Sequence, residues 1–138
     1  MISYITIGAD DMDRAYRFYA SFLPSLGYEL TESDLGVSCR CVDERNSSAL
    51  MPEFYIKHTF DGRPATAGNG AMIAFQATNQ KQVRELHSAA ILAGGTDEGA
   101  PGFRAAYGPR FYVGYLRDPQ GNKLALFSND PNEPGRDD

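Results

Sequence analysis

The first half of the chain has a pattern of apolar and polar residues that predicts a β-α-β-β-β module. Residues 2–8 alternate as a half-buried strand does, with Ile5 and Ile7 on one face and Tyr4 and Thr6 on the other. A helix should follow, because apolar residues then recur at three-to-four spacing, at Met12, Ala15, Tyr19, Phe22 and Leu26. Three further strands are expected at residues 28–32, 36–42 and 53–57.

Local signals mark the ends of these elements. Asp10 or Asp11 can cap the N-terminus of the helix. Pro24 should make its last turn irregular, and Gly27 is a suitable stop. A turn is expected at residues 46–48, between the last two strands of the module.

The second half repeats this plan at an offset of 68 residues, which places Tyr4 on Met72. Residues 70–77 alternate as a strand, and Asn79 with Gln82 forms a capping box for the next helix. The buried stripe of this helix is expected to be Val83, Leu86, His87, Ala90 and Ile91, with Gly94 and Gly95 ending it. The remaining strands are expected at residues 103–107, 111–117 and 123–127.

We therefore expect an α+β fold made of two tandem β-α-β-β-β modules. One domain should span residues 1–128, with module one at about 1–58, a Gly- and Pro-rich linker at about 59–69 and module two at about 70–128. Residues 129–138 contain little to bury and are expected to form a loose C-terminal tail. Modules of this kind curl their mixed sheets around a shared concavity and keep their helices outside.

The turn DPQG at residues 118–121 determines which side chains of the last hairpin face that concavity. Gly121 suits the left-handed position of a three-residue turn, and this register pairs Tyr115 with Ala125. The side chains expected to face the helix are Leu116, Leu124 and Leu126. Those expected to face inward are Val113, Tyr115, Ala125 and Phe127 here, and Tyr4, Thr6, Met72, Ala74 and Gln76 on the first strand of each module.

Composition restricts the partners. The 138-residue chain carries a net charge of −5 and has no cluster of Lys and Arg, which disfavours nucleic acid and anionic membranes. It contains no apolar run of the ~20 residues that would span a bilayer, and its start lacks the features of a signal peptide. Cys39 and Cys41 are expected to be reduced structural cysteines, with a redox or metal role as the alternative. We expect the protein to be cytoplasmic.

Two segments carry a resemblance to a known family. Residues 5–28 form the strand–helix start of module one, and residues 68–127 add GGT after the second helix and DPxGN after an aromatic strand. In this order and spacing the chain resembles the vicinal oxygen chelate superfamily, which includes glyoxalases, bleomycin-resistance proteins and extradiol dioxygenases. The resemblance implies the two-module fold described above and a homodimer.

The resemblance also implies where a metal would bind. Metal-dependent members carry ligands on the first and last strand of each module. These positions fall on Tyr4, Met72 and Ala125, with the fourth near Lys57. None of these is a usual ligand of a divalent metal, so the chain is interpreted as a glyoxalase-like branch without the usual ligands, with no metal and no cofactor expected.

The other chemistry-bearing residues have structural explanations. His87 lies on the apolar stripe of the second helix and should pack there. His58 follows the fourth strand and belongs either to the surface or to the cavity rim. The stretch GGTDEGAPG at residues 94–102 lacks the Lys-Ser/Thr of a phosphate loop and is interpreted as a helix stop followed by a turn.

An aromatic and partly polar pocket remains as the candidate site. Its expected substrate-binding residues are Tyr4, Tyr55, Met72, Arg104, Tyr107, Tyr115 and Phe127. Arg104 either pairs with a ligand anion at the mouth or is a surface arginine, and Tyr107 and Phe111 either line the pocket or pack in the core. No catalytic residue is identified.

Three functions fit these expectations. The first is a metal-free protein of the glyoxalase/bleomycin-resistance type that binds a small aromatic or amphipathic molecule between its modules or across a dimer. The second is a glyoxalase-like lyase or isomerase, related to lactoylglutathione lyase, of unknown substrate. The third is an assembly role that uses the faces of the modules for dimerisation.

Overall fold

The computed structural model describes residues 1–42 and 51–137, and the turn expected at residues 46–48 lies outside them. Module one contains β1 (Tyr4–Gly8), α1 (Met12–Ala20), a short 3₁₀ helix η1 (Pro24–Leu26), β2 (Tyr28–Ser33), β3 (Gly36–Cys41) and β4 (Glu53–Lys57). Module two contains β5 (Ile73–Gln76), α2 (Gln80–Leu92), β6 (Thr96–Phe103), β7 (Tyr112–Arg117) and β8 (Lys123–Ser128).

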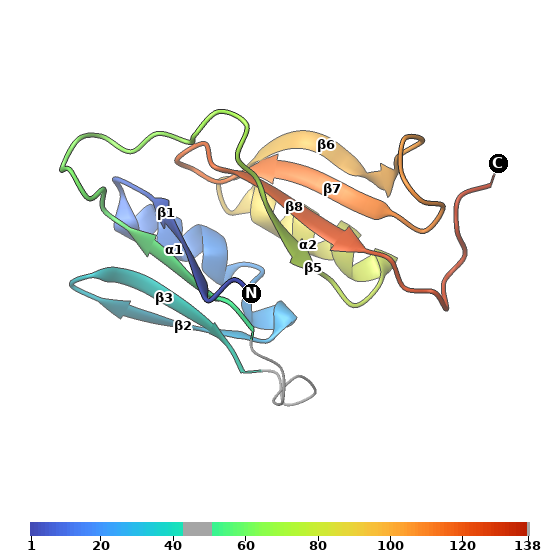
Figure 1. The fold of residues 1–138 in the computed structure, drawn as a ribbon, viewed down its shortest axis with the longest axis horizontal. Helices are drawn as coiled ribbons and strands as arrows, with labels where there is room; N and C mark the ends of the chain where they lie inside the picture. Colours follow the sequence, from blue (N-terminus) through green and yellow to red (C-terminus); the bar gives the residue numbers. More distant parts are fainter. Residues whose placement is uncertain (43–50, 138) are drawn as a thin grey trace.

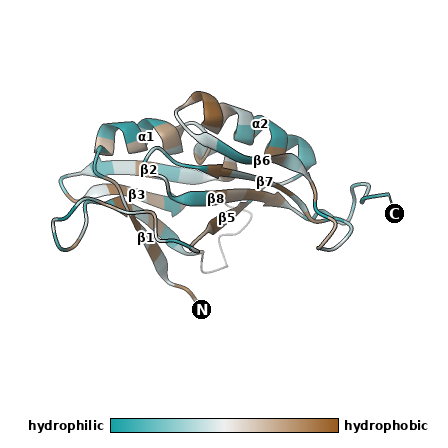
Figure 2. Cartoon of the chain, turned by 90° about the horizontal axis from the view of Figure 1, so that it is seen from above, coloured by the Kyte–Doolittle hydropathy of each residue, from teal (hydrophilic) through white to brown (hydrophobic). Residues whose placement is uncertain are grey.

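Each module forms its own four-stranded mixed sheet (Figure 1). The strand orders are β1-β4-β3-β2 and β5-β8-β7-β6, and in both the first strand runs parallel to the last one. Both helices lie on the same side of the two sheets (Figure 2). This arrangement confirms the α+β fold of two tandem modules, although in the described residues the two sheets do not close on each other.

The helix ends follow the expected signals. Asp11 caps α1 by accepting a hydrogen bond from the backbone N–H of Arg14, and Gly27 ends η1 with a left-handed φ of 92°. Asn79 caps α2 by accepting from the N–H of Gln82, whose own side chain accepts from the N–H of Thr78. The start of each helix is therefore determined by local chemistry.

The prediction for the strand after α2 is wrong. The sequence indicated a turn at residues 94–102 and a strand at 103–107, but β6 already begins at Thr96 and ends at Phe103. Irregular pairing with β7 around Gly99, which has a φ of 155°, absorbs the glycines and the proline that suggested a turn. Residues 104–107 instead form a turn, closed by the N–H of Tyr107 on the carbonyl of Arg104.

The two modules share one apolar core on the helix side of their sheets. Phe75 of β5 lies in this core, 5% exposed, and its ring makes edge-on contacts with three aromatic rings of module one. The centroid distances are 5.8 Å to Phe22, 6.0 Å to Tyr28 and 5.4 Å to Phe54. Aromatic packing across the boundary therefore joins the modules into one unit.

The turn at residues 118–122 is also a contact between modules. Asp118 is 3% exposed, and its carboxylate accepts hydrogen bonds from the backbone N–H groups of Gln120 and Asn122 and from the Asn122 amide. It also accepts from the hydroxyl of Tyr19 on α1, at 2.6 Å. Asn122 in turn donates to the carbonyl of Gly8 at the end of β1. We call this group of Asp118, Asn122, Tyr19 and Gly8 the clasp.

Gly95, just after α2, also supports the packing of the two modules. A Cβ atom at Gly95 would lie 2.8 Å from Cε2 of Phe18 and 2.9 Å from the carbonyl oxygen of Ala90. The absence of a side chain at Gly95 therefore allows α1 of module one to approach this corner closely.

His87 lies on the buried face of α2 and is 7% exposed. Its Nε2 lies 3.0 Å from the carbonyl oxygen of Tyr115, as expected for a packing residue.

Although a loose tail was expected, residues after β8 make specific hydrogen bonds. The Glu133 side chain accepts from the backbone N–H of Gln80 at the start of α2. Arg136 donates to the carbonyls of Arg104 and Tyr107, so the tail lies against the turn before β7. Within the part of the chain that is described, neither helix has the length and apolar character needed to span a bilayer.

Candidate functional site

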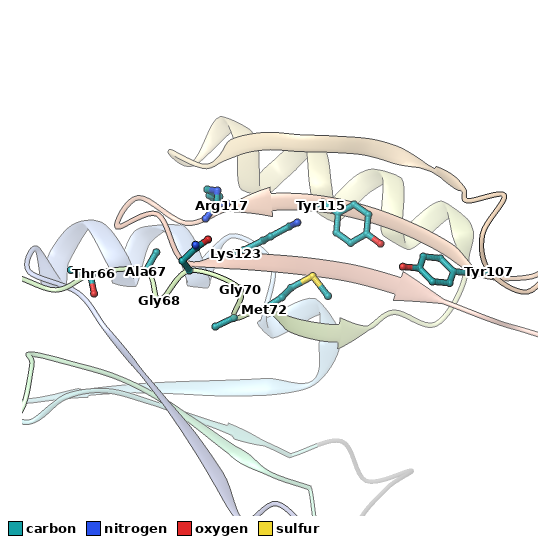
Figure 3. A pocket seen from close by; sticks show the side chains of 11 residues that line it. Thr66, Ala67, Gly68, Gly70, Met72, Tyr107, Tyr115, Arg117 and Lys123 are labelled. Carbon is teal, nitrogen blue, oxygen red and sulfur yellow. The ribbon is translucent and has the colours of Figure 1, made fainter.

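The face of the second sheet that points away from the helices carries a pocket of about 740 Å³. Strands β7 and β8 supply Tyr115, Arg117 and Lys123, and Tyr107 comes from the turn after β6. The linker supplies the remaining wall, with residues 66–71 followed by Met72. Figure 3 shows Lys123, Tyr115, Tyr107 and Met72 around this hollow.

The register of the last hairpin explains why these side chains share a face. Tyr115 pairs with Ala125 and Arg117 pairs with Lys123, as the turn chemistry of Gly121 predicted for the first pair. Leu116, Leu124 and Leu126 are fully buried on the helix side, which confirms the predicted parity. Arg117 and Lys123 were not among the expected site residues, but the same register identifies them, because they form the next pair on the same face, two residues along from Tyr115 and Ala125.

Tyr115 is the centre of a group of cations. The Lys123 ammonium lies 5.1 Å from the centroid of the Tyr115 ring, and the Arg104 guanidinium carbon lies 5.3 Å from it. Arg104 also donates to the carbonyls of Ala100 and Phe103, and it does not line the pocket. Arg104, expected either to pair with a ligand anion or to be a surface arginine, is thus hydrogen-bonded to β6, beside the ring that lines the pocket.

The other expected residues of module two extend the aromatic surface. Phe127 on β8 contacts Phe111 at 4.7 Å between centroids, and Phe111 contacts Tyr107 at the same distance. Of these three, Tyr107 reaches the pocket and is 53% exposed. Met72 also lines the pocket. It lies just before β5, since this strand begins at Ile73 and not at residue 70 as expected.

The expected residues of module one lie on a different surface. Tyr4 and Tyr55 make an edge-on ring contact at 5.8 Å on the corresponding face of the first sheet, where Tyr55 borders a smaller hollow of about 350 Å³. The Tyr55 hydroxyl donates to the Glu53 carboxylate, and this hydrogen bond raises the pKa of Tyr55. Within one chain, the structure does not bring these residues into the module-two pocket.

The residues at the family's metal-binding positions are not suited to bind a metal ion in this chain. In β5 and β8, Ala125 pairs with Ala74, and the corresponding partner of Thr6 in module one is Tyr55, not Lys57. Phenol, thioether and methyl groups therefore occupy the positions at Tyr4, Tyr55, Met72 and Ala125, and these are poor ligands for Zn²⁺, Mn²⁺ or Fe²⁺. Among the described residues, no three His, Cys, Asp or Glu side chains are grouped as a metal site.

The remaining candidate ligands are held apart. His58 is exposed beside the linker and borders a different hollow from Tyr115. Cys39 and Cys41 are free thiols on β3, and burial raises the pKa of Cys39 to about 12. A thiol with this pKa is a weak nucleophile at neutral pH, in agreement with a structural role for Cys39.

Comparisons with known proteins give the family. No protein-family model and no curated protein matches the chain. The crystal structure of a glyoxalase/bleomycin resistance protein from Albidiferax ferrireducens T118 matches with 32% identity and a TM-score of 0.79, over 94% of this chain and 99% of that one.

More distant structures share the fold. A glyoxalase-related enzyme from Fulvimarina pelagi matches with 17% identity and a TM-score of 0.71, over 94% of this chain and 88% of that one. A glyoxalase/bleomycin resistance protein/dioxygenase family enzyme from Burkholderia phytofirmans PsJN matches with 19% identity and a TM-score of 0.66, over 93% and 98%. With the two-module fold and the identity to the Albidiferax protein, the chain belongs to the glyoxalase/bleomycin resistance protein family of the vicinal oxygen chelate superfamily.

Proposed function

We propose that this protein binds a small aromatic or amphipathic molecule without the help of a metal ion. The observation that supports this most directly is the pocket of about 740 Å³ on module two, in which Met72, Tyr107 and Tyr115 offer apolar and aromatic surface. Pockets of roughly 300–1,000 Å³ with such linings are typical of small-molecule sites. The residues at the family's metal positions support the metal-free part of the proposal.

Self-association is part of the proposal. Tyr4 is 64% exposed and Met72 is 46% exposed, so both open sheet faces present large apolar side chains to solvent. A homodimer would cover these faces, and Tyr4 and Tyr55 could then approach a ligand bound on the partner. We place the protein in a reducing compartment such as the cytoplasm, where the free thiols of Cys39 and Cys41 would persist.

The first experiment measures metal content and then ligand binding. The protein is purified with zinc, nickel, iron and manganese supplied and without a chelator or an affinity tag. We expect less than about a tenth of an equivalent of any metal by elemental analysis, because a catalytic site needs about three protein ligands. A panel of aromatic and amphipathic compounds should then raise the melting temperature of the wild type, and less so that of Tyr115→Leu.

Three results would contradict the proposal. Near one equivalent of bound metal would show that the positions at Tyr4, Met72 and Ala125 do not define the ligand set. A panel without any stabilising compound would remove the binding function. Turnover of methylglyoxal with glutathione would establish the alternative, a glyoxalase-like lyase.

A further inference from the structure

We propose that the pocket on module two binds the acidic group of its ligand, and that Lys123 contacts this group. This inference rests on the proposed function, because it names the chemical class of the molecule held there. The ligand is an aromatic or amphipathic acid, with one carboxylate, sulfonate or phosphate group beside its apolar part. Both features are argued from the residues that surround Tyr115.

Lys123 presents a positive charge without a partner inside the pocket. Its ammonium lies over the Tyr115 ring, and in Figure 3 the side chain extends toward this ring across the pocket. Among the described residues, no carboxylate lies within 4.0 Å of Lys123. Lys123 is half-buried as a residue, and its ammonium, which lies over an aromatic ring, keeps its charge available to a bound anion.

The neighbouring Arg117 makes this position favourable for an anion. Arg117 is directly opposite Lys123 in the β7–β8 pair, and like charges in this position repel each other. Arg117 has a carboxylate of its own, because its Nε lies 2.5 Å from Oε1 of Glu98, and its Nη1 donates to the carbonyl of Gly121. Of these two facing cations, Lys123 is therefore the one whose charge no carboxylate among the described residues neutralises.

The rest of the pocket explains why the ligand is more than an inorganic ion. Met72, Tyr107 and Tyr115 provide an apolar surface next to the ammonium, whereas a free phosphate would contact only the polar end. The chain as a whole carries a net charge of −5, so this pocket is a local positive region on an acidic protein. An acid with an aromatic body matches both parts of the pocket.

Module one provides a matched control. The ammonium of Lys57 lies 5.2 Å from the centroid of the Tyr55 ring, nearly the same distance as for Lys123 and Tyr115. Here Glu53 lies on the same face of β4 and accepts from the Tyr55 hydroxyl. A lysine over a tyrosine is thus present in both modules, but the tyrosine of module one is hydrogen-bonded to a carboxylate, whereas Tyr115 has two cations over its ring.

The test compares two fluorescent dyes of nearly the same shape. Anilinonaphthalene sulfonate carries one negative charge, and N-phenylnaphthylamine is its neutral counterpart. We expect the wild type to bind the sulfonate about tenfold more tightly, because only this dye can make a charge-assisted contact with Lys123. Lys123→Met should remove about this tenfold preference and leave the neutral dye within about twofold, whereas Lys123→Arg should retain it.

The controls separate this inference from the proposed function. Lys57→Met should leave both dyes unchanged, and the sulfonate preference should shrink as salt is raised. Equal binding of the two dyes by the wild type, or an equal loss of both dyes in Lys123→Met, would overturn the inference and leave the binding function intact. Failure of the wild type to bind either dye would overturn the proposed function, and this inference with it.

Discussion

Removal of one hydroxyl group from the clasp should destabilise the entire fold. In Tyr19→Phe the ring remains, so its edge-on contacts with Phe18 at 4.9 Å and Phe54 at 5.3 Å are preserved and no cavity opens. The hydrogen bond to Asp118 is lost, and such a bond to a charged group contributes about 1.5–3 kcal/mol. Asp118 keeps three other donors, so we expect the free energy of unfolding to fall by about 1.5 kcal/mol, at the lower end of this range.

Urea denaturation followed by far-ultraviolet circular dichroism measures this loss. Tyr16→Phe is the matched control on the same helix, because Tyr16 is a half-buried residue whose hydroxyl has no hydrogen-bond partner among the described residues. This control should change the free energy of unfolding by less than about 0.5 kcal/mol. A loss in Tyr19→Phe no larger than in the control would refute the role of the clasp.

The same variant should change the response to alkaline pH. Burial first, and then the neighbouring Asp118 carboxylate, raises the pKa of Tyr19 well above its ordinary value. The folded state therefore holds this proton more tightly than the unfolded state, and the resulting stability is present below pH ~10 and lost as the pH rises further. Tyr19→Phe should lose less stability than the wild type above pH ~10, and an equal loss would contradict this assignment.

Three further predictions follow from contacts elsewhere in the fold. Gly95→Ala should lower the free energy of unfolding by about 2 kcal/mol in the same urea assay, because the new methyl group would lie 2.8 Å from Phe18. A change below about 0.5 kcal/mol would be evidence against this contact. Burial raises the pKa of Cys39 from its ordinary value near 9 to about 12, so the free energy of unfolding should fall as the pH rises from about 9 toward 12, and less steeply in Cys39→Ala; parallel losses would argue against this thiol as the source. Arg136→Ala removes hydrogen bonds to the turn that carries Tyr107, so it should weaken binding of anilinonaphthalene sulfonate by about threefold, which is equivalent to one modest hydrogen bond. Unchanged affinity would mean that the tail does not support the pocket wall.

The parts of the fold that follow local rules could be predicted from the sequence. Asp11 and Asn79 cap their helices as expected, and Gly121 determines the register that pairs Tyr115 with Ala125. Turn chemistry and strand alternation are short-range properties, so they act in the same way in any module of this type. The inward side of β7 and β8 follows from them directly.

The parts that depend on distant neighbours could not be predicted in this way. Gly99 and Pro101 suggest a turn locally, and only pairing with β7 makes their segment a strand. Residues 66–69 were expected to belong to a linker and residues 70–71 to the next strand, but together they form one wall of the pocket. The sequence around Asp118 likewise indicates a turn and contains no sign that Tyr19 of the other module is its partner.

The position of Phe75 has a consequence for the order in which the protein folds during synthesis. Residues 1–57 leave the ribosome first, yet the aromatic core of module one remains incomplete until Phe75 meets Phe22, Tyr28 and Phe54. The clasp residue Asp118 becomes available later still. The aromatic rings of the first module therefore stay exposed until residues of the second module are synthesised. A nascent chain halted before Phe75 should need chaperone protection.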